Sequence, residues 1–197
     1  DAEHFLASPN VFTLAQELGF CKTGEPLVWH EVYGTPGGRE NCLREWRVLS
    51  LAAPSLNLQA SGDPRIDRYP FSVKPDKPIR VERLMEIMRD GYQETEFDLT
   101  KHSAFNPQGK TSPLARPWGP PELFQLLGIR PERAISTPTS GYVFIAQLRE
   151  QLPPPVGNCL WFTYGPAYTS CFVPVYAGVS DLPEAWSQPA NFARIDR

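Results

Sequence analysis

Two arginines, Arg44 and Arg47, are the residues whose type and spacing best suit a chemical role. In a helix, a spacing of three residues places both guanidinium groups on the same side. Apolar residues surround the pair, so each charge needs a partner. One interpretation is an ion pair with Glu40, Glu45 or a more distant acid. The other is a fixed positive charge that lowers the pKa of a nearby thiol or binds a carboxylate, and the sequence leaves both open.

The histidines do not indicate a catalytic pair. A self-sufficient hydrolase needs a nucleophile, a base and a group that stabilises the oxyanion. His4, His30 and His102 lie in three different segments, and we interpret each as a structural residue. His102 follows Asp98 in a polar stretch that could face a cleft, but a turn capped by the Asp98 side chain is favoured. The sequence also lacks GxSxG, GxxxxGKS/T, GxGxxG and HExxH motifs, so those mechanisms have no support.

The four cysteines, Cys21, Cys42, Cys159 and Cys171, do not form a recognisable metal site. No two of them make a CxxC pair and no histidine lies at metal-site spacing, so we expect neither zinc nor another cofactor. Cys159 and Cys171 are equidistant from Gly165 in an expected hairpin, which would place them opposite each other. They form either a disulfide or a pair of small apolar residues on one sheet face.

The composition is that of a globular protein with an unusual amount of proline. Of 197 residues, 41% are hydrophobic and 21% charged, and the 22 prolines are about twice the usual share of roughly 5%. The 19 basic and 22 acidic residues are well mixed, so we expect no nucleic-acid partner. No apolar run reaches the roughly 20 residues that span a bilayer, so we expect no membrane association. The start, DAEHFLASPN, lacks a signal-peptide layout, which favours a cytoplasmic over an exported protein and leaves the compartment open.

The periodicity of apolar residues predicts three helices. The first has Ser8 as its N-cap and covers residues 9–18. The second follows Asn41, its expected cap, and stops before Pro54. The third covers residues 81–88, where apolar and charged residues occupy opposite faces.

Long proline-rich loops separate these helices. Residues 55–78 and most of residues 95–131 contain too many prolines and glycines for long regular elements, with one short helical stretch at residues 121–127. No repeat, low-complexity tract or linker is present in the sequence. We therefore expect residues 1–197 to form a single domain or a partial domain, without an internal boundary.

The last third of the chain predicts strands of one antiparallel sheet. Three segments are rich in aromatic and β-branched residues and separated by turn residues: residues 142–147, 159–164 and 170–176. Gly165 and Pro166 supply the turn between the second and third strands, whereas residues 152–157 are too proline-rich to be more than a connector. Pro174 lies inside the third strand, which predicts an edge position or a bulge.

Five segments carry a family signature: LASPNVFTLAQELGF, LREWRVLSLAAPSL, YPFSVKPDKPIRVERLMEIMRDGYQETEFDLTK, GYVFIAQLREQLP and LWFTYGPAYTSCFVPVYAG. In this order they resemble the PepD-type dipeptidases, which are cysteine N-terminal-nucleophile hydrolases. The match runs across almost the whole chain. The resemblance implies an α+β fold that is part of an αββα sandwich, in which antiparallel strands of two stacked sheets lie between packed helices and long proline-rich loops.

The resemblance also implies a mechanism in which a mature N-terminal cysteine is the nucleophile and its own α-amino group is the base. Such an amino group has a pKa of about 7.7–8.0, so it accepts the thiol proton near neutral pH without a histidine. None of the four cysteines opens the chain, so we expect the nucleophile upstream of Asp1 and expect this chain alone to be inactive. The expected parent protein is a dipeptidase that acts by cysteine acyl transfer. Its expected partners are dipeptide substrates, the missing N-terminal segment and further copies in a homo-oligomer.

A second resemblance concerns the arginine pair. Choloylglycine-type amidases carry an active-site arginine in an SRFVR-like helix, and LREWR, residues 43–47, is similar to it at both arginines. Arg44 is the first choice for the active-site charge, and Arg47 is kept as the second because the correspondence is short and Leu43 replaces the leading serine. The segment FDLTKHSAFNPQG departs from the glycine-rich FDLTKGLAAGPFG form of the family. Two alternatives stay open: an N-acyl amidase of the same fold, and a non-catalytic homologue that serves as a binding or structural subunit.

Overall fold

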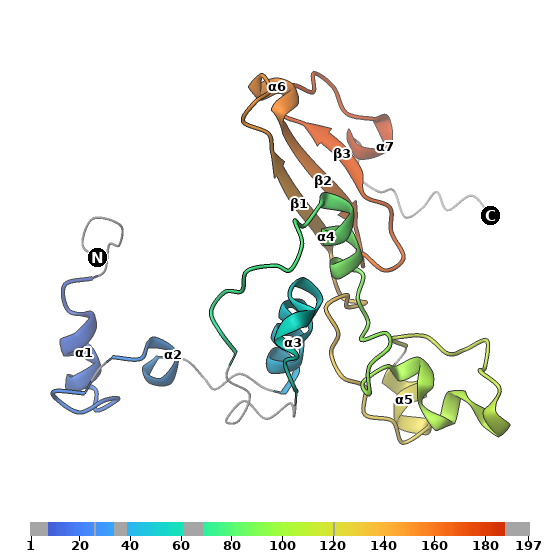
Figure 1. Cartoon of the computed structure of the whole chain (residues 1–197), viewed down its shortest axis with the longest axis horizontal. Coiled ribbons are helices and arrows are strands. Elements are labelled where there is room, and N and C mark those ends of the chain that lie inside the picture. Colours follow the sequence, from blue (N-terminus) through green and yellow to red (C-terminus); the bar gives the residue numbers. More distant parts are fainter. Residues whose placement is uncertain (1–7, 26, 34–38, 61–68, 120, 188–197) are drawn as a thin grey trace. The chain divides into compact units, whose positions relative to one another are not determined.

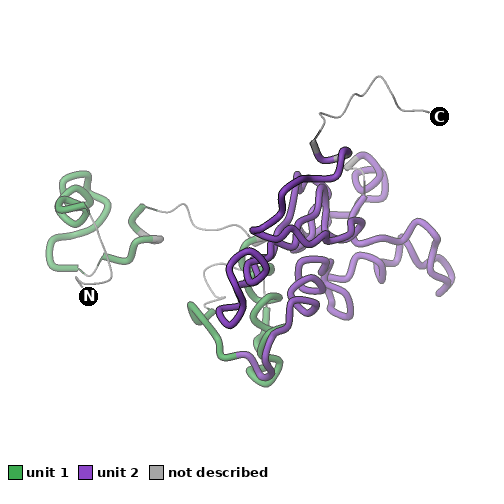
Figure 2. Tube along the Cα trace, turned by 90° about the horizontal axis from the view of Figure 1, so that it is seen from above, with its two compact units in different colours: residues 1–74 green, residues 75–197 purple. Residues whose placement is uncertain are grey.

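The computed structural model describes residues 8–25, 27–33, 39–60, 69–119 and 121–187. Its internal contacts divide the chain into unit 1, residues 1–74, and unit 2, residues 75–197 (Figure 2). The division falls in the proline-rich loop that precedes the third predicted helix. A single domain without an internal boundary stays a prediction.

The described part of unit 1 is helical, with α1 (Val11–Glu17), α2 (Trp29–Val32), α3 (Arg39–Ala52) and a 3-10 turn (Pro54–Leu56). The prediction of Ser8 as N-cap is wrong: Asn10 occupies that position, and the Ser8 hydroxyl bonds to the Asn10 side chain instead. The prediction of Asn41 as a cap is also wrong, because α3 already begins at Arg39. The predicted stop before Pro54 is confirmed.

Hydrogen bonds from two aromatic side chains connect the described segments of unit 1. The Tyr33 hydroxyl donates to the carbonyl of Val11 at 2.7 Å and so joins the end of α2 to the start of α1. The Trp46 indole N–H donates to the carbonyl of Leu58 at 2.7 Å and fixes the chain that follows the 3-10 turn against α3. Each aromatic side chain thus provides apolar packing surface and also a hydrogen bond that holds two segments together.

Unit 2 begins with α4 (Val81–Met88), the most clearly predicted helix. Its apolar face buries Ile87, whereas Arg83 and Glu86 form an exposed ion pair at 2.9 Å on the other side. The following segment contains three 3-10 turns (Leu99–Lys101, Ser103–Phe105 and Pro107–Gly109) and α5 (Pro121–Leu126). This confirms the largely irregular structure predicted for residues 95–131. The segment has its own small core, formed by Leu99, Phe105, Phe124 and Ile129.

The predicted sheet is confirmed as three antiparallel strands in the order β1 (Tyr142–Leu148), β2 (Asn158–Tyr164) and β3 (Val173–Tyr176) (Figure 1). The connector between β1 and β2 includes a single helical turn, α6 (Pro154–Gly157), where only an irregular connector was predicted, since proline is well tolerated in a first helical turn. A further turn, α7 (Glu184–Ser187), follows the sheet. The edge position predicted for Pro174 is confirmed among the described strands.

The expected placement of Cys159 opposite Cys171 is wrong. The register of β2 and β3 places Cys159 opposite Tyr176, and Cys171 lies in the loop before β3. Both cysteines are free thiols, Cys159 buried and Cys171 exposed. The error arises because the loop between the strands is not symmetric about Gly165: β2 ends at Tyr164, whereas β3 starts only at Val173.

The two faces of the sheet differ in what covers them. One face packs on α4 and buries Ile145, Cys159 and Thr163. The opposite face carries Tyr142, Phe144, Leu160 and Tyr164, whose side chains are all exposed in the structure, together with the half-buried Phe162. On this second face the Trp186 ring of α7 lies 5.6 Å from Phe162 and 5.5 Å from Tyr164, centroid to centroid.

Helices and an antiparallel sheet in one chain confirm the α+β class. Layering as part of an αββα sandwich requires a second sheet, and the described residues form a single one. None of the helices in the described ranges is long and apolar enough to cross a membrane.

Candidate functional site

The two arginines chosen from the sequence both lie on α3 in unit 1 and are half-buried. The Arg44 guanidinium donates to the Asn41 side-chain oxygen one turn earlier, which fixes its position along the helix. Leu43, which precedes Arg44, is fully buried, whereas Glu45, which follows it, is exposed. The side chain of Glu40 lies outside the described residues. A role for either arginine in the chemistry therefore stays a prediction.

None of the four cysteines is paired in a disulfide, and their surroundings differ. Cys42 on α3 and Cys159 on β2 are buried, with 7% and 3% of their surfaces exposed. A nucleophile must be reached by its substrate, so burial disfavours both. Cys21 is half-buried after α1 and Cys171 is exposed in the loop before β3, so these two remain the accessible thiols of the described chain.

His102 belongs to a capped turn, as the favoured interpretation of its segment predicted. The Asp98 side chain accepts a hydrogen bond from the Thr100 N–H and caps the 3-10 turn Leu99–Lys101. His102 caps the next turn in the same way, since its Nδ1 accepts the N–H of Ala104 at 3.2 Å. The ring is exposed and is engaged in backbone structure. No signal for a catalytic base arises from it.

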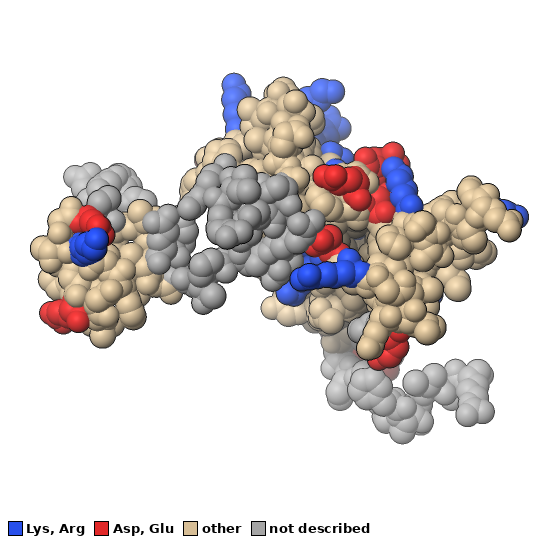
Figure 3. Space-filling view, turned by 90° about the horizontal axis from the view of Figure 1, so that it is seen from below, with Lys and Arg blue, Asp and Glu red and all other residues tan. Residues whose placement is uncertain are grey.

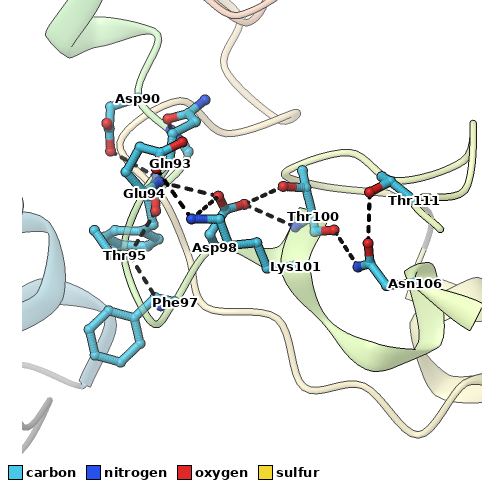
Figure 4. Close-up of polar contacts among 12 residues, drawn as sticks. Asp90, Gln93, Glu94, Thr95, Phe97, Asp98, Thr100, Lys101, Asn106 and Thr111 are labelled. Atoms are coloured by element: carbon cyan, nitrogen blue, oxygen red, sulfur yellow. Dashed lines mark hydrogen bonds and ion pairs between the residues drawn. The ribbon is translucent and has the colours of Figure 1, made fainter. Parts of the chain in front are cut away.

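A buried carboxylate, Asp98, organises the polar cluster of unit 2 (Figure 4). Its Oδ1 accepts from the Thr100 N–H at 3.0 Å and from the Thr100 hydroxyl at 2.6 Å, and its Oδ2 accepts from the Glu94 N–H at 3.2 Å. The Lys101 ammonium lies 3.8 Å from Oδ2 and 3.4 Å from the Glu94 carboxylate. Only 6% of Asp98 is exposed, so these partners replace the water that the charge would otherwise bind.

The cluster holds a turn with unusual backbone geometry. Tyr92 and Glu94 have φ angles of +67° and +64°, in the left-handed region that non-glycine residues rarely adopt. Three contacts fix this turn: Asp90 Oδ1 accepts the Tyr92 N–H at 2.9 Å, Asp98 accepts the Glu94 N–H, and the Thr95 hydroxyl donates to the Tyr92 carbonyl at 2.7 Å. Sequence reasoning missed this turn, because neither Tyr nor Glu signals a left-handed conformation.

An apolar cavity of about 420 Å³ lies beside this turn within unit 2, and its wall is formed largely by residues 117–119, 124–125 and 129–138. The turn is joined to that wall at two points: the Tyr92 hydroxyl donates to the Arg133 carbonyl at 3.0 Å, and the Ser136 N–H donates to the Asp90 carbonyl at 3.0 Å. At a third point the contact is too close for a side chain, since a Cβ on Gly91 would lie 2.5 Å from the Pro117 Cβ. The strained turn therefore fixes the shape of the cavity.

The cavity is suited to binding rather than to bond cleavage. Trp118, Phe124, Ile129 and Ala134 contribute apolar surface, and the lining includes neither cysteine nor histidine. Its volume lies within the roughly 300–1,000 Å³ of typical ligand pockets. The Ser136 hydroxyl in the wall is occupied, because it accepts the N–H of Tyr168 at 3.1 Å.

Neither a charged patch nor a metal-binding cluster marks a second candidate site among the described residues. On the face shown in Figure 3, acidic and basic side chains are interspersed rather than gathered into separate fields. Within the described ranges, no group of three or more His, Cys, Asp or Glu side chains is placed to hold a metal ion.

We predict that the Asp98 carboxylate is a main source of local stability. Asp98→Ala leaves two partly buried N–H groups and a hydroxyl without this acceptor and should lower the free energy of unfolding by about 2–4 kcal/mol. Asp98→Asn keeps one acceptor oxygen and should cost roughly half as much. Urea denaturation measures both, with Glu96→Ala in the same loop as an exposed control that should stay within about 0.5 kcal/mol. Equal effects of Asp98→Ala and Glu96→Ala would contradict this role.

Comparison with known proteins identifies the family. The description "Peptidase family C69" matches residues 1–196. The chain is 23% identical over 195 residues to Dipeptidase A of Lactobacillus helveticus, an alignment that covers 98% of this chain and 36% of that protein. It is 25% identical over 183 residues to a probable dipeptidase of Salmonella dublin, which covers 91% of this chain and again 36% of the relative. The resemblance to the PepD-type dipeptidases is thereby confirmed: the chain belongs to peptidase family C69.

Proposed function

We propose that this chain is part of a dipeptidase that hydrolyses dipeptides by cysteine acyl transfer. The family match over residues 1–196 carries the proposal, and the names of the two relatives support the same substrate class. Because the chain spans only 36% of each relative, the activity is proposed for the parent protein. The thiolate attacks the peptide carbonyl, the amine leaves with the proton taken from the thiol, and water hydrolyses the thioester to release the second amino acid.

The nucleophile is proposed to lie in the parent protein outside residues 1–197. Two observations support this. The buried Cys42 and Cys159 are closed to a substrate, and the cavity of unit 2 has no thiol in its lining. A nucleophile supplied by the rest of the parent would leave this chain to position substrate and charge.

We also propose that the sheet is one layer of an αββα sandwich. Helix α4 covers one face, and the opposite face exposes a contiguous set of aromatic and aliphatic side chains. Tyr142 and Tyr164 are 61% and 59% exposed, and Leu148 is 78% exposed. An apolar face of this kind is what sheet-on-sheet packing buries. The second sheet would come from the rest of the parent, and the proposed homo-oligomer would be built from complete parent subunits.

Thiol chemistry tests the location of the nucleophile. In the full-length parent protein, iodoacetamide should abolish dipeptide hydrolysis, because it alkylates the nucleophilic thiol. The double variant Cys21→Ser and Cys171→Ser, which removes the two accessible thiols of this chain, should keep its activity within about twofold and its sensitivity to iodoacetamide. The measurement is initial rates on a panel of dipeptides and N-acyl amides.

Three results would overturn this part of the proposal. Loss of activity in the double variant would place the nucleophile in this chain. Hydrolysis of N-acyl amides in preference to dipeptides would favour an amidase of the same fold. No thiol-dependent hydrolysis of either substrate class by the full-length protein would favour a binding or structural subunit.

Arg44 is proposed as the fixed positive charge of the active site, with Arg47 as the second choice. Arg44→Met removes the charge and keeps most of the side-chain volume, so kcat/KM should fall by about 100-fold, as for the loss of a single stabilising group. Arg44→Lys should recover part of that loss. Arg83→Met is the control, since Arg83 lies on the exposed face of α4, and it should change kcat/KM less than twofold. An unchanged rate in Arg44→Met with a matching loss in Arg47→Met would reverse the choice, and no loss in either would end it.

The cavity of unit 2 is proposed to receive an apolar side chain of the dipeptide. Ala134 lines the cavity and is 5% exposed, so Ala134→Leu should fill part of the space. We expect KM for dipeptides with large apolar side chains to rise by about tenfold or more, whereas KM for diglycine should stay within about twofold. Leu126→Phe on α5 is the control, because Leu126 is 83% exposed and lies outside the cavity lining. Equal KM changes for large and small dipeptides in Ala134→Leu would contradict this role.

A further inference from the structure

The two edges of the sheet are built differently. At the β3 edge, the Ala177 N–H donates to the Asn158 carbonyl. With the observed register, Val173 and Val175 therefore also form their backbone hydrogen bonds with β2. In this alternation Pro174 and Tyr176 direct their backbone groups away from β2. Pro174 has no N–H to offer, and the Tyr176 carbonyl already accepts the N–H of Val179 at 3.0 Å. This edge is therefore largely closed to a further strand.

Among the described residues, the β1 edge has no such protection. The Gly165 N–H donates to the Gly141 carbonyl and the Arg149 N–H donates to the Gly157 carbonyl, so the odd-numbered residues of β1 bond to β2. The N–H and C=O groups of Phe144, Ala146 and Leu148 consequently point outward. The strand, YVFIAQL, is seven residues long and has neither proline nor a charged residue. Natural sheets use such residues to protect an edge, so an unprotected strand of this length is typical of one that is paired.

A groove of about 500 Å³ runs beside this edge. It is lined by Ile145, Ala146, Gln147 and Leu148 on one side and by residues 79–82 and Leu84, around the start of α4, on the other. Consecutive residues of a strand point to opposite sheet faces, so a groove that contacts all four lies along the edge itself. An open strand edge opposite a helix is the geometry in which an extended segment adds to a sheet.

We propose that β1 pairs along this edge with an extended strand from the part of the parent protein outside residues 1–197. The occupant is assigned to the same polypeptide because this chain covers only 36% of each relative, which leaves ample chain to supply a strand. The assignment rests on the proposed function in one respect: the parent protein is taken to be about as long as the two relatives. The added strand would also extend the apolar face that carries Tyr142 and Phe144.

Hydrogen exchange in the full-length parent protein tests the pairing at single amides. The outward amides of Phe144, Ala146 and Leu148 should exchange as slowly as the β2-bonded amides of Val143 and Ile145. They should exchange on the order of 100-fold more slowly than the outward amide of Tyr176, which serves as the matched edge control. Exchange of the three amides as fast as that of Tyr176 would overturn the proposal. The readout does not depend on catalysis, so an inactive parent protein would refute the dipeptidase function without affecting this test.

A photo-cross-linking benzoylphenylalanine in place of Leu148, which lines the groove and is 78% exposed, identifies the occupant. A cross-link within one polypeptide, mapped by mass spectrometry to a segment outside residues 1–197, would support the assignment. A cross-linked product of dimer mass would instead show that a second copy fills the edge, and a cross-link to residues 1–197 of the same chain would show that the chain covers its own edge. Either of these outcomes would overturn the proposed occupant even if the three amides were protected.

Discussion

The arrangement of unit 2 depends on the burial of one carboxylate. Asp98 gives up nearly all contact with water, and this is tolerated because the backbone of Glu94 and Thr100 and the Thr100 hydroxyl donate to it. The same bonds hold the preceding turn, in which Tyr92 and Glu94 adopt left-handed conformations that cost on the order of 1 kcal/mol or more each. The turn in turn fixes the cavity wall through the Tyr92 hydroxyl. The strained turn and the shape of the cavity thus both depend on the hydrogen bonds to the Asp98 carboxylate.

Helix α4 connects the strained turn to the sheet, because the turn follows the end of the helix and the side of the helix packs on β1. A helix of eight residues is marginal by itself, so its tertiary contacts decide its stability. Its flank packs on β1, and just past its end Arg89 donates to the carbonyls of Ala167 and Ser170, at 3.0 and 3.2 Å. The Arg89 guanidinium also lies 4.9 Å from the centre of the Phe172 ring. The sheet is therefore anchored to the flank of this short helix, and the β2–β3 loop and the strained turn to its C-terminal end.

Sequence reasoning succeeded where a pattern has one physical meaning. The bounds of α4 and of the aromatic, β-branched strands were predicted to within three residues, because burial of a regular face leaves a regular period. It failed where several local solutions compete, as for the caps at Ser8 and Asn41 and for the offset that separates Cys159 from Cys171. The cavity could not have been predicted, since its wall depends on a left-handed Tyr92 and on contacts between residues about 40 positions apart in the chain. The spacing of Arg44 and Arg47 left an ion pair and a fixed active-site charge equally open, and only the resemblance favoured the active-site role.

The distribution of functional groups over the described residues explains why the family match, rather than the geometry, carries the proposed reaction. The cavity offers apolar surface and occupied hydroxyls, and the arginine pair lies on a helix of the other unit. In the proposed roles both would position a substrate or a charge, and neither breaks a bond without a nucleophile. Among the described residues, α4 covers one face of the sheet, whereas the other face has the Trp186 ring of α7 against Phe162 and Tyr164 and leaves Tyr142 and Phe144 exposed, and the sheet ends at β1. The edge of β1 and its exposed face could both be covered by further β-strands. A parent protein that supplies the nucleophile on such a structure would complete the sheet and the active site together.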